Sequence, residues 1–178
     1  DTAGEFLRQA GLFQKDEDEM TETAQKAAKM HPSLYLAVLE YLESRQKSER
    51  QLQVGKEALE KIDKSCRLRS QAALYTAEAA LKAGDKKTAE MCWIEAFESH
   101  STPVNYLRIA ANIEEPASYR ERAAQVINAL PYAGKTDRYG YELNHELQIN
   151  FLSENDRSLM GFFMGDFESS MKECLETR

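Results

Sequence analysis

Small and aromatic residues recur between residues 67 and 130 at the spacing of helices that pack in antiparallel pairs. Trp93 and Phe97 lie four residues apart and therefore on one helical face, where they can fill the space between neighbouring pairs. Gly84-Asp85 interrupts the pattern as a turn would. Two helices can approach closely where small side chains face each other, and such positions here are Ala77, Ala80 and Ala89.

The same pattern returns elsewhere in the chain at a period of roughly 31 to 40 residues. A shift of 38 residues places Ala58-Leu59 on Ala96-Phe97, and a shift of 81 places Gly84-Asp85 on Gly165-Asp166. A single helical pair cannot bury its apolar face alone, so such units stack on their neighbours. The sequence predicts an all-α domain over residues 1–178, a right-handed stack of about four or five antiparallel helical hairpins.

Two family resemblances can be stated. Ala80-x3-Gly84-Asp85-x3-Ala89-x3-Trp93-x2-Ala96 resembles the consensus of a tetratricopeptide repeat, which implies a tetratricopeptide-like α-α superhelix. Residues 69–130, about a third of the chain, are also similar to the helical region after the zinc module of some bacterial SWIM zinc-finger proteins. That similarity rests on Gly84, Trp93-x2-Ala96-Phe97, Pro103, Tyr106-Leu107 and Tyr119-x-Glu121-Arg122. The Cys/His module itself is absent, so metal or DNA binding is not carried over.

Composition narrows the class of protein. With 42% hydrophobic and 30% charged residues the chain is too apolar for general disorder, and its net charge of −7 disfavours a surface that binds nucleic acid throughout. Cys66, Cys92 and Cys174 have no zinc-ligand spacing, and no apolar run approaches the roughly 20 residues of a membrane span. We expect a reduced, cytoplasmic protein without a cofactor. Because the sequence starts at Asp1 without Met and ends within a helical pattern, we expect it to be a piece of a longer protein.

Apolar periodicity and helix-breaking residues predict the order of the helices. They indicate helices over residues 3–13 and 19–30, a third from Pro32 to residue 46, and a fourth capped by Ser48. After residue 130 we expect a loop at 131–137, a helix at 141–152 and a final helical pair.

Catalytic equipment is sparse. His31, His100 and His145 stand singly, and the sequence contains neither a Gly-rich phosphate loop nor a GxSxG motif. Glu142, His145 and Glu146 come nearest to a metal site, but they have no second matching motif. We therefore predict no enzyme activity, no catalytic residue and no metal ligand.

The tetratricopeptide resemblance implies a partner-binding groove, because the first helix of each pair lines the concave side in that family. Aligned on the well-matched repeat, six polar residues fall on this surface: Gln71, Glu78, Lys82, Asn105, Arg108 and Asn112. Long polar side chains can hold an extended peptide through hydrogen bonds and ion pairs. We predict a non-catalytic scaffold that binds a protein or peptide partner.

Two other surfaces leave alternatives open. Residues 45–69 hold a basic strip that either is a solvated face paired with nearby acids in helical spacing or binds a nucleic-acid backbone or an acidic peptide. The members of this strip are Arg45, Lys47, Arg50, Lys56, Lys61, Lys64, Arg67 and Arg69, interleaved with Glu49, Glu57, Glu60 and Asp63. The apolar segment 159–167 either packs on the preceding helical pair or mediates self-association or contact with a further part of the protein.

Overall fold

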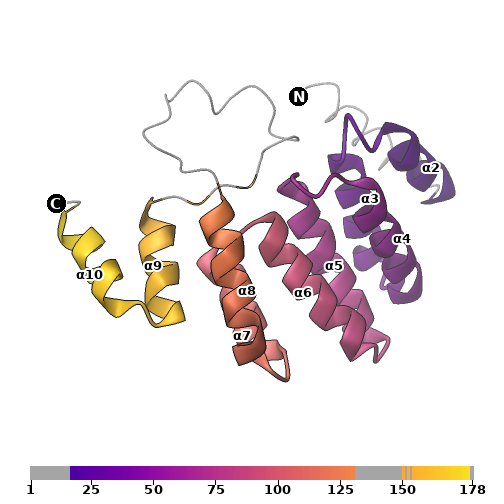
Figure 1. Ribbon diagram of the computed structural model, residues 1–178. Coiled ribbons are helices and arrows are strands. Elements are labelled where there is room, and N and C mark those ends of the chain that lie inside the picture. Colours follow the sequence, from indigo (N-terminus) through magenta and orange to yellow (C-terminus); the bar gives the residue numbers. More distant parts are fainter. Residues whose placement is uncertain (1–16, 131–149, 151, 153, 177–178) are drawn as a thin grey trace.

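The computed structural model describes residues 17–130, 150, 152 and 154–176, and these residues form nine α-helices without a strand. The helices stand side by side and alternate in direction, from α2 at one end of the row to α10 at the other (Figure 1). Their bounds are α2 Glu17–Ala27, α3 Ser33–Ser44, α4 Ser48–Lys61, α5 Leu68–Lys82, α6 Lys86–Ser99, α7 Pro103–Asn112, α8 Pro116–Ala129, α9 Glu154–Met164 and α10 Phe167–Glu176. The all-α prediction is confirmed for this part of the chain.

Each helix packs on its neighbours in sequence, and some pack on the next but one. The most extensive contact joins α5 to α6, followed by that between α4 and α5. In addition α3 contacts α5, and α7 contacts α9. The stack is therefore held by contacts both within and between consecutive helical pairs.

Local signals explain where several helices begin. Glu17, Asp18 and Glu19 lie in the first turn of α2, where negative charge is favoured by the helix dipole. The predicted break at His31-Pro32 is confirmed, since α3 begins at Ser33. Ser48 does not cap α4 as predicted, because Lys47 occupies the N-cap position and Ser48 is already helical.

The two Gly-Asp turns have the same conformation, which confirms their predicted equivalence. Gly84 and Gly165 have positive φ angles of 76° and 92°, the left-handed region that ends helices at glycine. In the first turn the amide of Asp85 donates to the carbonyl of Ala80 at 2.9 Å, and in the second the amide of Asp166 donates to the carbonyl of Gly161 at the same distance. The hairpins α5–α6 and α9–α10 are thus turned by one shared motif.

Buried side chains form a core that runs along the stack. Ala77, Ala80 and Ala89 are buried between α5 and α6, as the close approach of two helices requires. Phe97 is fully buried, and its ring lies 5.9 Å from that of Tyr106 and 6.1 Å from that of Tyr119. Trp93 packs against the clusters on both sides of α6. The prediction that Trp93 and Phe97 fill the space between neighbouring pairs is confirmed.

Several predicted elements lie outside the described residues: the helix at 3–13, the loop at 131–137 and most of the helix at 141–152. The expected final helical pair is present as α9 and α10. No helix within the described part of the chain is long and apolar enough to cross a membrane.

Candidate interaction surfaces

Exposed residues of α5 form a polar stripe on the outer side of the helix. Gln71, Glu78 and Lys82 are exposed there as predicted, and Tyr75 lies half-buried between them. The Lys82 Nζ is 2.8 Å from the Glu78 Oε1, an ion pair between residues four apart. Lys82, the one lysine of α5 that the sequence predicted to line the groove, is therefore paired within its own helix.

The neighbouring helix α3 adds two glutamates that the sequence analysis did not single out. The Glu43 carboxyl hydrogen-bonds to the Glu78 carboxylate, and this bond, with partial burial and the Glu78 charge, raises the pKa of Glu43. Lys82 is the main cause that lowers the pKa of Glu78, so Glu43 is the member of the pair that holds a proton more readily. Glu40, one turn before Glu43 on α3, adds to the negative charge around it.

Tyr75 lies within the field of these three carboxylates. Burial raises the pKa of its hydroxyl, and the negative charges of Glu40, Glu43 and Glu78 raise it further. We call this surface, Glu40, Glu43, Tyr75 and Glu78 with Lys82 at its edge, the acidic face. The two glutamates of α3 are three residues apart in sequence and so lie on one side of the helix. This spacing alone did not predict the acidic face, because the contact between α3 and α5 was not known from the sequence.

The three predicted groove residues of α7 do not form an open surface. Asn105 is only 3% exposed, and its side-chain amide donates to the Ser70 Oγ at 3.1 Å and to the carbonyl of His100 at 2.8 Å. Arg108 is half-buried and donates to the Asn105 Oδ1, while the Asn112 amide donates to the carbonyl of Arg108 at 2.7 Å. The placement of Asn105 on a binding surface is therefore wrong, because its polar atoms are used to join α5, α6 and α7.

A second asparagine, which the sequence analysis missed, completes this buried polar junction. Asn150 accepts a hydrogen bond from the Ser101 amide at 3.1 Å and donates to the Glu98 carbonyl at 2.9 Å. It is 5% exposed. Its partners lie about fifty residues earlier in the chain, so no local sequence pattern predicts these hydrogen bonds.

Most of the basic strip is engaged in contacts between helices. Arg50 reaches Asp18 of α2 at 2.9 Å, Lys47 pairs with Glu17, and Lys56 lies 3.8 Å from Asp85. These partners differ from the interleaved acids of the same helix that one of the two interpretations of the sequence expected. The acids have other roles, since Glu57 accepts a hydrogen bond from the Tyr35 hydroxyl at 2.6 Å and Asp63 accepts two from Ser65.

Arg69, the last residue of the strip, is buried rather than exposed. Its Nε lies 2.6 Å from the Glu95 Oε1, and its Nη1 donates to the carbonyls of Leu59 and Ile62. A buried cation needs this degree of compensation, because removing its water shell is costly. Arg69 therefore holds the end of α4 against α5 and α6 and is not available to a partner.

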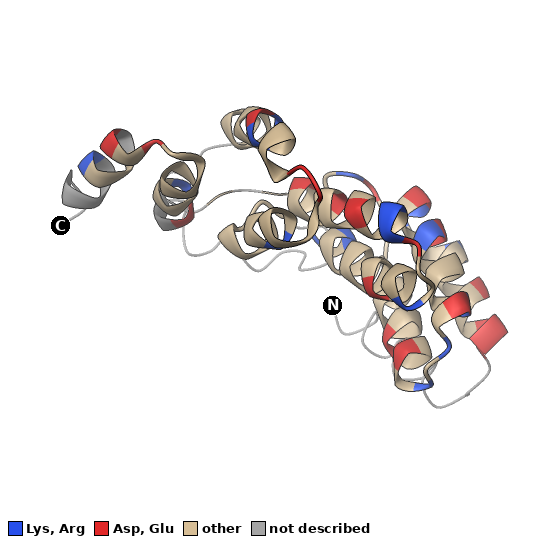
Figure 2. Ribbon diagram, turned by 90° about the horizontal axis from the view of Figure 1, so that it is seen from below, with Lys and Arg blue, Asp and Glu red and all other residues tan. Residues whose placement is uncertain are grey.

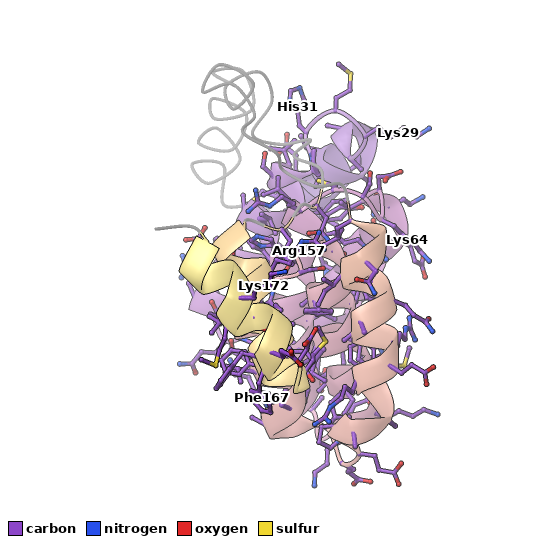
Figure 3. The ribbon with its side chains drawn as sticks, turned by 60° about the vertical axis from the view of Figure 1, so that its left-hand side comes forward. Lys29, His31, Lys64, Arg157, Phe167 and Lys172 are labelled. Carbon is purple, nitrogen blue, oxygen red and sulfur yellow. The ribbon has the colours of Figure 1, made fainter. Side chains whose placement is uncertain are left out.

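Three lysines of the N-terminal half line a cleft. The cleft has a volume of about 740 Å³ between the α2–α3 and α4–α5 connections, and Lys29, Lys61 and Lys64 lie along it with Glu60 and Asp63. Lys29 and His31 stand together at the top of Figure 3, and Lys64 lies lower on the right. Arg69 also lines this cleft, so four basic side chains face two acidic ones there, but Arg69 is already paired with Glu95. The basic strip is thus divided among several helix contacts and does not form one continuous surface.

His100 is positioned by an arginine in a half-buried site. The Arg67 Nη2 lies 2.6 Å from the His100 Nε2, an arrangement that requires that nitrogen to accept a hydrogen bond. Burial, followed by the Arg67 charge, lowers the pKa of His100 to about 4. Its ring is therefore neutral at physiological pH and acts as a structural acceptor.

Other chemically active groups give no assembled site among the residues that the structure describes. Within them no group of three His, Cys, Asp or Glu side chains is arranged to hold a metal ion. Cys66 and Cys92 are buried, and burial raises the pKa of the Cys92 thiol to about 11. Glu142, His145 and Glu146 lie outside the described residues.

Comparison with known proteins returns no match: none was found among protein-family models, curated proteins or solved structures. The functional argument therefore rests on the geometry of the surfaces described above.

Proposed function

We propose that this protein is a non-catalytic scaffold that binds a basic segment of a partner protein on the acidic face of α3 and α5. The observation that carries the proposal is that the charges of three carboxylates, Glu40, Glu43 and Glu78, all act on the hydroxyl of the half-buried Tyr75 and raise its pKa. The tetratricopeptide-like superhelix remains our proposal for how the stack is arranged, and it would place this face on the concave side.

Like charges on adjacent helices are unfavourable for the folded protein taken alone. Two unit charges 4 Å apart in water repel by about 1 kcal/mol, and partial burial increases this value. The hydrogen bond with Glu78, partial burial and the Glu78 charge together raise the pKa of Glu43, and Lys82 pairs with Glu78 at 2.8 Å. A lysine or arginine from a partner would relieve the repulsion, so the surface is better suited to a bound cation than to water.

Tyr75 adds a second element of recognition. A cation over a tyrosine ring gains about 0.5–1 kcal/mol at an exposed site and more when it is desolvated. The protein already contains this contact elsewhere, where the Arg45 guanidinium lies 5.5 Å from the centre of the Tyr41 ring. An arginine of the partner placed over Tyr75 would at the same time pair with the surrounding carboxylates.

The test uses fluorescein-labelled peptides of one length, one rich in Arg and Lys and one rich in Asp and Glu, followed by fluorescence anisotropy. We expect the basic peptide alone to bind, with affinity that falls as salt is raised, and Glu43→Lys/Glu78→Lys to weaken binding at least ~10-fold. The matched control is Glu49→Lys/Glu60→Lys, which changes the net charge equally on exposed positions of α4. Equal binding by both variants would remove the proposal.

The alternative that the basic strip at 45–69 serves a nucleic-acid-associated protein stays a prediction. A labelled single-stranded oligonucleotide in the same assay addresses it directly. Binding that falls steeply with salt and is weakened by Lys61→Glu/Lys64→Glu would favour this alternative over the acidic face.

A further inference from the structure

Four large apolar side chains are exposed next to one another on the last hairpin, and we call them the C-terminal apolar face: Leu159, Phe162, Phe167 and Met171. Their exposed fractions are 44%, 49%, 54% and 63%. The Phe162 and Phe167 rings meet edge to face with centres 5.0 Å apart, which joins the residues of α9 to those of α10. The segment 159–167, whose packing was left open by the sequence, is thus only partly buried, since Met160 is enclosed and Leu159 and Phe162 are not.

The fold of the hairpin does not require apolar residues at these positions. The α5–α6 hairpin has the same Gly-Asp turn 81 residues earlier, and there the equivalent positions hold Glu78, Leu81, Lys86 and Glu90. Three of those four residues are charged. Since the same backbone is made with charged residues, the apolar face of α9–α10 indicates a contact rather than a packing requirement.

The hairpin stands at one end of the row of described helices. Figure 1 shows α10 at the outer end with α9 as its neighbour, and among the described helices α9 is the one that α10 packs against extensively. Here residues 158–165 carry no charge, and the part of α9 next to the turn is accordingly tan in Figure 2.

We infer that the C-terminal apolar face is the contact between two copies of this chain in solution. An aromatic or long apolar side chain presents roughly 150–250 Å² in all, so four half-exposed ones leave about 400 Å² per copy. A two-fold symmetric pair covers both patches, about 800 Å² of apolar area. Because about 65% of a homodimer interface is apolar, the whole contact would bury about 1,200 Å², the lower end of the range for stable interfaces.

The charges beside the face fit a two-fold arrangement. Glu168 and Lys172 are exposed and lie four residues apart on α10, on either side of Met171 in sequence, and Figure 3 shows Phe167 and Lys172 on this helix at the front of the molecule. When two α10 helices cross antiparallel, Glu168 of one copy faces Lys172 of the other, and the reverse pair forms by symmetry. Charges of both signs therefore lie beside the apolar face.

Sedimentation velocity over a range of micromolar concentrations tests the inference with the full chain. We expect the wild-type protein to form dimers and Phe167→Glu/Met171→Glu to raise the dissociation constant at least ~100-fold with unchanged circular dichroism. The control, Met91→Glu/Val104→Glu, adds the same charge at residues that are 61% and 57% exposed on α6 and α7, and it should still form dimers.

A charge reversal addresses the arrangement without touching an apolar residue, and unchanged circular dichroism would show that α10 is still folded in each variant. Glu168→Lys should weaken the dimer several-fold, and Glu168→Lys/Lys172→Glu should restore it. A wild-type protein that is monomeric at every concentration, or a dimer that survives Phe167→Glu/Met171→Glu, would overturn the inference. Glu43→Lys/Glu78→Lys should leave the dimer intact, which separates this contact from the acidic face.

Discussion

Gly55 allows α4 and α5 to approach closely, and its replacement by alanine tests whether this contact limits the stability of the stack. A methyl group at position 55 would stand 2.1 Å from the Thr76 Oγ1 and 3.0 Å from the Thr76 Cβ. Thr76 is fully buried, and its hydroxyl donates to the carbonyl of Ala72 at 2.7 Å. Thr76 therefore cannot move away from the added methyl group unless it gives up this hydrogen bond or displaces its buried neighbours.

The magnitude follows from two opposing terms. Ordinary contact distances begin near 3.4 Å, so the helices would have to separate by about 1 Å, or Thr76 would have to leave its rotamer and its hydrogen bond. Overpacking of this kind costs about 1–3 kcal/mol, and the lost hydrogen bond adds about 1 kcal/mol. Alanine recovers about 1 kcal/mol through its higher helix propensity. We expect Gly55→Ala to lower the free energy of unfolding by about 2 kcal/mol.

A double-mutant cycle with urea unfolding checks the reasoning. Thr76→Ala removes the hydroxyl and methyl groups and leaves only the Cβ, 3.0 Å from the added methyl group, so Gly55→Ala should cost much less in that background, a coupling of at least about 1 kcal/mol. Gly84→Ala is the contrasting control, because its φ of 76° strains alanine although no atom lies within 4 Å of the added methyl group. If Gly55→Ala costs the same with and without Thr76, the contact is not what limits the approach of the two helices.

Three further outcomes follow from the buried polar contacts. Arg69→Met should destabilise the protein by about 3–5 kcal/mol in urea unfolding, because Glu95 and two carbonyls lose their charged donor; a loss below 1 kcal/mol would contradict this role. Asn105→Ala should cost about 1–3 kcal/mol by leaving buried partners unsatisfied, whereas Asn112→Ala, on the exposed end of the same helix, should change stability by less than about 0.5 kcal/mol. The pKa of His100 is about 4 in the folded protein against 6.5 for an unperturbed histidine, so its contribution is intact above pH 6.5 and is lost as the pH falls toward 4. His100→Gln should make the urea midpoint less dependent on pH in that window, and an unchanged dependence would refute the assignment.

The candidate surface was predictable in part. Gln71, Glu78 and Lys82 could be placed on an exposed stripe from one repeat, because exposure along a helix follows a period of 3.6 residues. The same register failed on α7, where Val104 and Leu107 are exposed and Asn105 is buried. A shift of one residue turns a side chain by about 100° around the helix, so a small error in alignment exchanges the buried and the open positions.

The sequence alone determined the features that depend on a few consecutive residues. The helix break at Pro32, the turns at Gly84 and Gly165 and the small residues of α5 and α6 follow from backbone conformation and side-chain size, which act locally. They were sufficient to predict an all-α chain of packed helices.

The tertiary structure decided which polar side chains are used inside the protein and which remain for a partner. Arg69 meets a carboxylate 26 residues away, and Asn150 meets the α6–α7 turn about fifty residues away. Glu43 acquires its raised pKa from Glu78 on another helix. Electrostatic and hydrogen-bond energies depend on separation in space and on burial, and neither quantity is defined for a residue until the helices are packed.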